Sequence, residues 1–343
     1  MKTSDFDFDL DESLIAQHPT KERSDCRLMV MDRNTGNLEH DYFYQLRHYL
    51  RPGDLLVMND TRVIPARLFG HRPDKEESIE VLLLKNVKDN LWEALVKPGK
   101  KMEVGQEVVF SDELSASVID ILEGGQRLIK LCYTGILNEI LDRLGNMPLP
   151  PYITEKIKDK EDYQTVYARV DGSAAAPTAG LHFTDKLMDE LRDFGCRIGF
   201  LTLHVGLGTF RPVKAEEIKD HLMHAEYYDL PQETADLINR TKSEGGRVIS
   251  VGTTSTRTLE SVYQKHGQIV ADSGWTDIFI YPGYRYGVID GIITNFHLPK
   301  STLIMMISAF CGRENILEAY RIANEKKYRF FSFGDAMLIL DRS

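Results

Sequence analysis

The stretch RVISVGTTSTRTLESVY, residues 247–263, decides the fold class. Its apolar beginning is typical of a buried strand, and Leu259, Val262 and Tyr263 recur at the spacing of one helix face. The same order of strand and helix returns along the chain. Further strands are predicted at 27–33, 54–59, 198–205, 276–283 and 291–295, and helices after Thr184 and Pro231 and over 302–311 and 314–326. Alternating strands and helices predict an α/β main domain, with a largely parallel sheet or barrel covered by helices.

Residues 65–148 have a different pattern. Short strand-like runs such as IEVLLL (79–84), LWEALV (91–96) and RLIKLCY (127–133) are separated by turn-rich pieces, for example KPGKK (97–101). Several short strands without a helix between them are typical of a small antiparallel barrel or sandwich. We therefore expect an inserted β-barrel domain over 65–148, and a barrel-like α/β main domain formed by 1–64 and 149–343.

Composition limits the class of protein. The chain has 343 residues, 42% of them hydrophobic, which suffices for a sizeable core. Its formal net charge of −10 argues mildly against a nucleic-acid partner, although one face can still be basic. The acidic beginning lacks the features of a signal peptide, and the apolar run 303–310 is too short to cross a bilayer. The four scattered cysteines form no CxxC motif. We expect a cytoplasmic protein without a membrane segment.

The loops at predicted strand ends carry the candidate site residues. GSAAAPTAGLHFT (172–184) places small residues before a capped helix, which lets a backbone approach a ligand closely. We expect His182 to be catalytic, and Thr178, Gly180 and Phe183 to contact substrate. A tight structural connection is the alternative interpretation.

LHVGLGTFRP (203–212) also follows a predicted strand. Its two glycines partly match a dinucleotide-binding loop, but Arg211 stands in the place of the third glycine, so NAD binding is rejected. The amides here could instead face a nucleoside or a carboxylate, which makes Gly206, Gly208, Thr209 and Arg211 candidate substrate contacts. His204 is a catalytic candidate, with a core histidine as the equal alternative.

HLMHAE (221–226) has the strongest metal-like spacing in the chain. A strand predicted to begin at Ala225 would, however, divide His221 and His224 from Glu226. We therefore favour acid or base roles for His224 and Glu226, without a metal. A metal-dependent hydrolase that uses these three residues is one alternative function.

Three further strand ends complete the candidate site. GTTSTR (252–257) opens a helix whose amides favour an anion, so Thr253, Thr254, Ser255 and Arg257 are candidate substrate contacts. In TNFHLPKST (294–302), Asn295 and His297 could read base edges and Phe296 could stack on a base, and His297 is also a catalytic candidate. Asp60, a catalytic candidate, and Arg62, a candidate substrate contact, follow the strand at 54–59, although such a pair is more often structural. We expect the loops at 173–183, 204–211, 252–257 and 294–302 to converge on one cavity.

These strings together closely resemble the S-adenosylmethionine:tRNA ribosyltransferase-isomerase family of the queuosine pathway. The resemblance rests, in chain order, on NDTRVIPARL, PLPPYI, YQTVYA, AAPTAGLHFT, HVGLGTFRPV, HAEYY, GTTSTRTLES, TDIFIYPGY, TNFHLPKSTL and YRFFSFGDAML, which run from residue 59 to residue 338. Phe333 and Tyr286 depart from the family pattern, where Tyr and Phe respectively are expected. The resemblance implies an α/β body with an inserted β-barrel, a monomer, and no metal.

The resemblance also implies the reaction. The family transfers and isomerises the ribosyl unit of S-adenosylmethionine onto 7-aminomethyl-7-deazaguanine at the tRNA wobble position, which gives epoxyqueuosine and releases adenine and methionine. S-adenosylmethionine is then a consumed substrate whose sulfonium acidifies the neighbouring 5′ carbon. A base must remove that proton, and the candidates are His182, His204, His224 and His297, followed by Glu226 and Asp60. A non-catalytic RNA-binding protein built around the inserted barrel is a second alternative.

Overall fold

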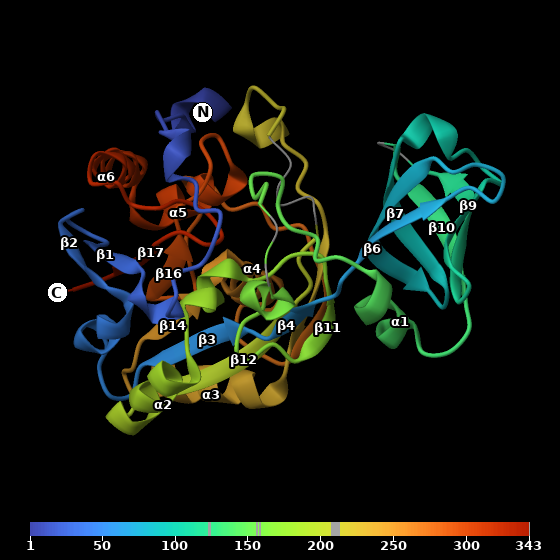
Figure 1. Ribbon diagram of the computed structural model, residues 1–343. Coiled ribbons are helices and arrows are strands. Elements are labelled where there is room, and N and C mark those ends of the chain that lie inside the picture. Colours follow the sequence, from blue (N-terminus) through green and yellow to red (C-terminus); the bar gives the residue numbers. More distant parts are fainter. Residues whose placement is uncertain (123–124, 156, 158, 207–212, 343) are drawn as a thin grey trace. The chain divides into compact units, whose positions relative to one another are not determined.

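The computed structural model describes all residues except 123–124, 156, 158, 207–212 and 343. The chain divides into two compact units, and Figure 1 shows its elements in sequence colours. Unit 1 comprises Met1–Thr61, Pro151–Val170 and Pro177–Ser343. Unit 2 comprises Arg62–Pro150 and Asp171–Ala176.

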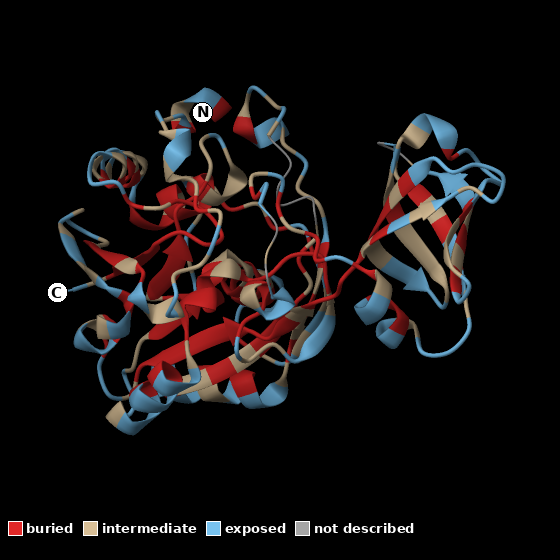
Figure 2. Cartoon of the chain, viewed as in Figure 1, coloured by how far each residue is buried: buried red, intermediate tan, exposed pale blue. Residues whose placement is uncertain are grey.

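Unit 1 is built on one large sheet with the strand order β15-β13-β12-β3-β14-β16-β17-β1-β2. The strands are β1 Arg27–Asp32, β2 Leu38–Tyr42, β3 Leu55–Asn59, β12 Arg197–Leu203, β13 Glu226–Leu230, β14 Val248–Val251, β15 Asp272–Thr276, β16 Gly291–Asn295 and β17 Ala336–Leu340. Every residue of β3, β14, β16 and β17 is buried, as expected of central strands that are covered on both faces. Figure 2 shows this buried centre within unit 1.

The helices of unit 1 cover both faces of this sheet. They are α2 Asp185–Phe194, α3 Gln232–Ser243, α4 Gly252–His266, α5 Thr302–Cys311 and α6 Arg313–Glu325, with the short 3₁₀ helices η4 Phe43–Tyr49 and η8 Thr178–His182 near the site. Leu187 and Leu191 of α2 share a core cluster with Leu56. A Cβ atom at Gly199 of β12 would instead lie against Leu55 of β3 and against helix α3. Because neighbouring residues of a strand face opposite sides, Leu55 and Leu56 mark the two faces of the sheet, with α3 on one face and α2 on the other. The α/β class predicted from the sequence is confirmed.

Local signals set the helix ends as predicted. The side chain of Thr184 accepts a hydrogen bond from the amide of Leu187 and so caps α2, which ends at Gly195 in the left-handed conformation. Ser301 caps α5 in the same way through the amide of Ile304. Pro231 directly precedes α3.

The prediction of a largely parallel sheet was wrong in part. β3 pairs in parallel with β12 and β14, β14 with β16, and β1 with β17. The pairs β1–β2, β12–β13, β13–β15 and β16–β17 are antiparallel. The strand predicted at 276–283 is also wrong, because β15 ends at Thr276 and the next residues are irregular. Its apolar residues Ile278 and Ile280 instead pack on Met306 of α5.

Unit 2 contains the closed barrel that the sequence predicts. Its strands follow the order β10-β7-β6-β5-β8-β9, with antiparallel pairings throughout. They are β5 Arg67–His71, β6 Ser78–Lys88, β7 Leu91–Lys97, β8 Glu107–Ser111, β9 Leu114–Ile121 and β10 Arg127–Tyr133, followed by helix α1 Leu137–Leu144. A separate two-stranded sheet joins β4 Thr61–Val63 to β11 Val170–Ser173. No helix in the described ranges of either unit is long and apolar enough to span a membrane.

Candidate functional site

One edge of the unit 1 sheet gathers most of the predicted site residues. The carboxyl ends of β12, β3, β14 and β16 lie at this edge, because their pairings are parallel and in register. Since β17 runs antiparallel to β16, the beginnings of β17 and β1 lie at the same edge. Loops after these strands therefore meet there, as in other open α/β sheets.

The first group at this edge is centred on His182, at the end of η8. Its Nδ1 lies 3.2 Å from the Sγ atom of Cys26, and its Nε2 lies 3.0 Å from Nδ2 of Asn295. The same Nδ2 donates to the carbonyl of Phe331, and Oδ1 of Asn295 accepts from the hydroxyl of Thr178. The amide nitrogen can only donate, so Nε2 of His182 accepts and its proton resides on Nδ1. His182 is thus a neutral imidazole with both nitrogens engaged.

Burial keeps two of the candidate histidines neutral. Desolvation lowers the pKa of His182 to about 3, with further lowering by the charge of Arg329, and desolvation lowers the pKa of His297 to about 3. His297 lies after β16, where its Nε2 is 2.8 Å from the hydroxyl of Thr294. Both rings are therefore neutral, with a single ring proton each, near neutral pH.

This pair predicts a loss of stability in mild acid. The unfolded chain protonates both rings below pH about 6.5, whereas the folded rings resist protonation until pH about 3. The unfolded state therefore binds more protons in this window, and stability falls as the pH falls. Between pH 7 and pH 5 we expect the free energy of unfolding to decrease by on the order of 4 kcal/mol for the two rings together.

Urea titrations across this pH range measure the effect. The double variant His182→Gln/His297→Gln should lose the histidine part of the slope, and either single variant should lose about half of it. The same substitution at the exposed His48 is the matched control and should keep the wild-type slope. A slope that the double variant leaves intact would contradict the assignment.

The second group is a buried ion pair with a histidine attached. Glu226, at the start of β13, and Arg257, on α4, are both 2% exposed and form a salt bridge. Oε1 of Glu226 also lies 3.1 Å from Nε2 of His224 and accepts from the amide of Gly206 at 2.9 Å. Burial raises the pKa of Glu226, but Arg257, His224 and the Gly206 amide outweigh burial and lower the pKa to about 2. Glu226 is therefore ionised and orients His224, whose side chain is 28% exposed.

The third group follows β3. Asp60 is buried, accepts from the hydroxyl of Thr202 at 2.7 Å, and pairs with the exposed Arg169 at 2.7 Å. The next residue, Thr61, places its hydroxyl 2.8 Å from Nδ1 of His204. The ring of His204 stacks on Tyr227 with centroids 6.0 Å apart. Asp60 and His204 thus occupy the expected edge, each held by neighbours.

The beginning of α4 lies against η8. Gly252 adopts the left-handed conformation (φ +87°) and approaches Ala179. Val251, at the N-cap position, provides no side-chain hydrogen bond, so no described side chain caps the first-turn amides of α4. The hydroxyl of Thr254 is shielded and likewise has no hydrogen-bond partner in the described part of the chain. Ser255 instead bonds back to the carbonyl of Val251. Thr253 and Thr254 are partly exposed at this helix start.

Gly180 is required by close packing. A Cβ atom there would collide with the hydroxyl of Tyr167, with Thr165 close by. The hydroxyls of Tyr167 and Thr165 are shielded and have no partner among the described residues. Burial raises the pKa of Tyr167, with a further contribution from the charge of Asp60, so Tyr167 remains a phenol.

Several candidates lie elsewhere. The side chains of Phe183 and Phe296 have no exposed surface: Phe183 packs in the core with Phe43, and Phe296 packs among Tyr320, Tyr328 and Phe330. A base could stack on neither ring in this conformation, so we do not carry them into the proposed site. Arg62 is half-buried and belongs to unit 2. Gly208, Thr209 and Arg211 lie outside the described residues.

The metal alternative finds no support in the positions of its residues. His224 bonds to Glu226, whereas the ring of His221 packs edge-on against Phe279 with centroids 5.1 Å apart. Among the residues that the structure describes, no group of three His, Cys, Asp or Glu side chains is placed to hold a metal ion.

Sequence reasoning missed four residues that the fold brings to this edge. Cys26 contacts His182, Arg169 and Thr202 hold Asp60, and Tyr167 abuts Gly180. Tyr167 lies in the YQTVYA string, which contributed to the family resemblance, so that string was the available signal. Cys26 gave no signal, because an isolated cysteine before a strand is usually a small core residue.

Comparisons with known proteins show the family of this chain. Residues 3–339 match the family described as queuosine biosynthesis protein. A Finegoldia magna protein named S-adenosylmethionine:tRNA ribosyltransferase-isomerase is 61% identical over 99% of this chain and 98% of its own. A Caldanaerobacter subterraneus protein of the same name is 60% identical over 99% of this chain and 100% of its own. The crystal structure of S-adenosylmethionine tRNA ribosyltransferase from Thermotoga maritima is 37% identical, with a TM-score of 0.58, and the match covers 98% of this chain and 100% of that one.

Proposed function

Because this chain belongs to the S-adenosylmethionine:tRNA ribosyltransferase-isomerase family of queuosine biosynthesis, we propose that unit 1 carries this reaction at the sheet edge described above. The enzyme transfers and isomerises the ribosyl moiety of S-adenosylmethionine onto 7-aminomethyl-7-deazaguanine at the tRNA wobble position. The products are epoxyqueuosine in tRNA, adenine and methionine. The full-length match to the family is the observation that carries this proposal.

The first chemical step needs a base beside the 5′ carbon of S-adenosylmethionine. We assign this proton transfer to His224, because its ring is partly exposed and Glu226 orients it. Glu226 itself is a poor proton acceptor, since Arg257 and its other partners hold its pKa at about 2. Its role is to hold the ring and to stabilise the imidazolium that forms, as carboxylates do beside other catalytic histidines.

The start of α4 suits the carboxylate of the methionine part. Its first-turn amides carry the positive end of the helix dipole, and the hydroxyl of Thr254 can donate to the same group. The shielded hydroxyls of Thr165 and Tyr167 adjoin the η8 turn and could gain partners from ribose. A buried hydroxyl without a partner costs about 1–3 kcal/mol, so a ligand that satisfies it gains affinity.

His182 and Asn295 act as a positioning pair in this proposal. Both nitrogens of His182 are engaged, and desolvation keeps the ring neutral, so it fixes the Asn295 amide and the η8 turn. The amine of the precursor base must lose its proton before it attacks. We propose that Asp60, the carboxylate that directly follows β3, takes up this proton. We further propose a cytoplasmic, monomeric enzyme that requires no metal.

Incubation of the enzyme with S-adenosylmethionine and tRNA carrying the precursor base tests the function. Radiolabel in the ribose should enter the tRNA, and adenine and methionine should be released in equal amounts. Label in the methyl group should not enter the tRNA. Methylated tRNA, or label transfer without free adenine, would contradict the proposal, and tRNA that lacks the precursor amine is the negative control.

A further inference from the structure

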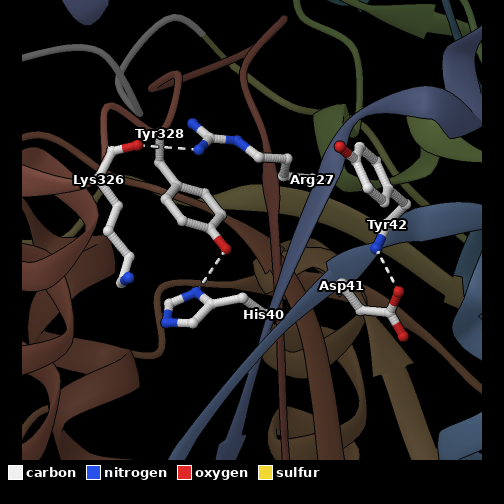
Figure 3. Close-up of a pocket in the computed structure, with 6 residues that line it drawn as sticks. All are labelled: Arg27, His40, Asp41, Tyr42, Lys326 and Tyr328. Atoms are coloured by element: carbon white, nitrogen blue, oxygen red, sulfur yellow. Dashed lines mark hydrogen bonds between the residues drawn. The ribbon is translucent and has the colours of Figure 1, made fainter.

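A second polar feature of unit 1 lies beside the start of β1 and takes no part in the chemistry proposed above. Arg27, His40, Asp41, Tyr42, Lys326 and Tyr328 line a hollow of about 370 Å³ (Figure 3). A hollow of this size can hold one nucleotide or a molecule of similar size. It opens next to β2, one of the two edge strands of the sheet.

The lining of this hollow carries two cations, Arg27 and Lys326, and one carboxylate, Asp41, although the chain as a whole is acidic. The exposed Lys326 forms no ion pair within the described ranges, while its carbonyl accepts from Arg27 at 2.9 Å. Arg27 lies over the ring of Tyr328, 3.9 Å from its centroid, and is partly neutralised by Asp335. The carboxylate of Asp41 is occupied by the hydroxyl of Tyr49 and the amide of Tyr42. Desolvation, followed by the charges of Lys326 and Arg27, lowers the pKa of His40.

Two exposed tyrosines extend from this hollow. Tyr42 and Tyr44 stack on each other with centroids 5.6 Å apart and an interplanar angle of 13°. They are 47% and 45% exposed, which is a large apolar surface for two neighbouring rings. Exposed aromatic faces beside cations are the usual means of binding single-stranded nucleic acid, since every base can stack on a ring and every phosphate attracts a cation.

One step along the chain links the hollow to the His182 group. Cys26 contacts His182 inside the site, and the next residue, Arg27, lines the hollow. The start of β1, where the hollow lies, is on the same edge of the sheet as Asn295 of β16 and two strands away from it.

We propose that Tyr42, Tyr44 and Lys326 form a subsite for an unpaired nucleotide of the tRNA outside the reaction site. Tyr42 and Tyr44 stack on its base, and Lys326 contacts a neighbouring phosphate. This inference rests on the proposed function, because it takes tRNA as the substrate. It adds a surface that sets the affinity for RNA and leaves S-adenosylmethionine binding unchanged.

The test compares two variants of the full-length enzyme, one that loses both aromatic rings and one that keeps them. The double variant Tyr42→Ala/Tyr44→Ala should raise the KM for tRNA about tenfold or more, with the KM for S-adenosylmethionine and the Tm unchanged. The variant Tyr42→Phe/Tyr44→Phe retains both rings and should keep the wild-type KM for tRNA. An unchanged KM for tRNA in the alanine variant, or an equal rise in both KM values, overturns the proposal.

Charge reversal provides an independent measurement. Lys326→Glu should weaken binding of a fluorescent anticodon stem-loop and reduce the slope of log affinity against log salt by about one. Lys186→Glu, on the exposed surface of α2, is the matched control and should leave both unchanged. Wild-type salt dependence in Lys326→Glu overturns the phosphate contact. Stem-loop binding needs no turnover, so a wild-type enzyme that releases no adenine would refute the proposed function separately.

Discussion

Replacement of Glu226 by glutamine is expected to lower the free energy of unfolding by about 3–5 kcal/mol and to reduce turnover strongly. The substitution removes the negative charge opposite Arg257, which is 2% exposed and would remain as an uncompensated buried cation. It also removes the charge that stabilises protonated His224. Urea unfolding and steady-state release of adenine measure the two effects.

Glu244→Gln is the matched control for this prediction. Glu244 pairs with Arg197 at a site where the carboxylate is 49% exposed, and surface pairs contribute about 0–1 kcal/mol. We therefore expect little change in either measurement. If Glu226→Gln unfolded at the wild-type urea concentration, the ion pair would not have the structural role assigned to it.

Replacement of His182 by alanine is expected to reduce turnover at least about a hundredfold, through loss of positioning, while the protein remains folded. The ring accepts a hydrogen bond from the amide of Asn295 and contacts Cys26. Its removal therefore takes away the contacts that position Asn295 and the η8 turn at the site. His297 follows β16, the strand that contains Asn295, and bonds to Thr294 of that strand. His297→Ala should have an effect of the same order. Adenine release under saturating substrates measures the change, and circular dichroism verifies the fold.

The pH profile distinguishes the two histidine roles. Substitution of His182, which only positions other groups, should leave the acid limb of the kcat–pH profile in place. Substitution of His224, which transfers the proton, should remove that limb. The exposed His48→Ala is the control for the substitution itself. Near-normal turnover in both His182→Ala and His297→Ala would remove these residues from the site.

The candidate site was predictable in part because backbone topology constrains where strand ends lie. Asp60, His204 and Asn295 each follow an apolar run, and the carboxyl ends of parallel strands share an edge. Phe296 has the same sequence setting, and Phe183 lies in another of the predicted site loops, yet both are in the core. A local pattern places a residue near a strand end but does not determine whether its ring turns inward.

The sequence by itself determined the class of fold, the inserted barrel and the family, because periodicity, turn residues and the series of motifs are local properties. Tertiary structure alone decided the pairings of the sheet, in which β17, the last strand in sequence, lies between β16 and β1. It also decided that Glu226 pairs with Arg257, and that His182 contacts Cys26, 156 residues away. Such contacts depend on packing between distant segments, and no pattern within either segment encodes the partner.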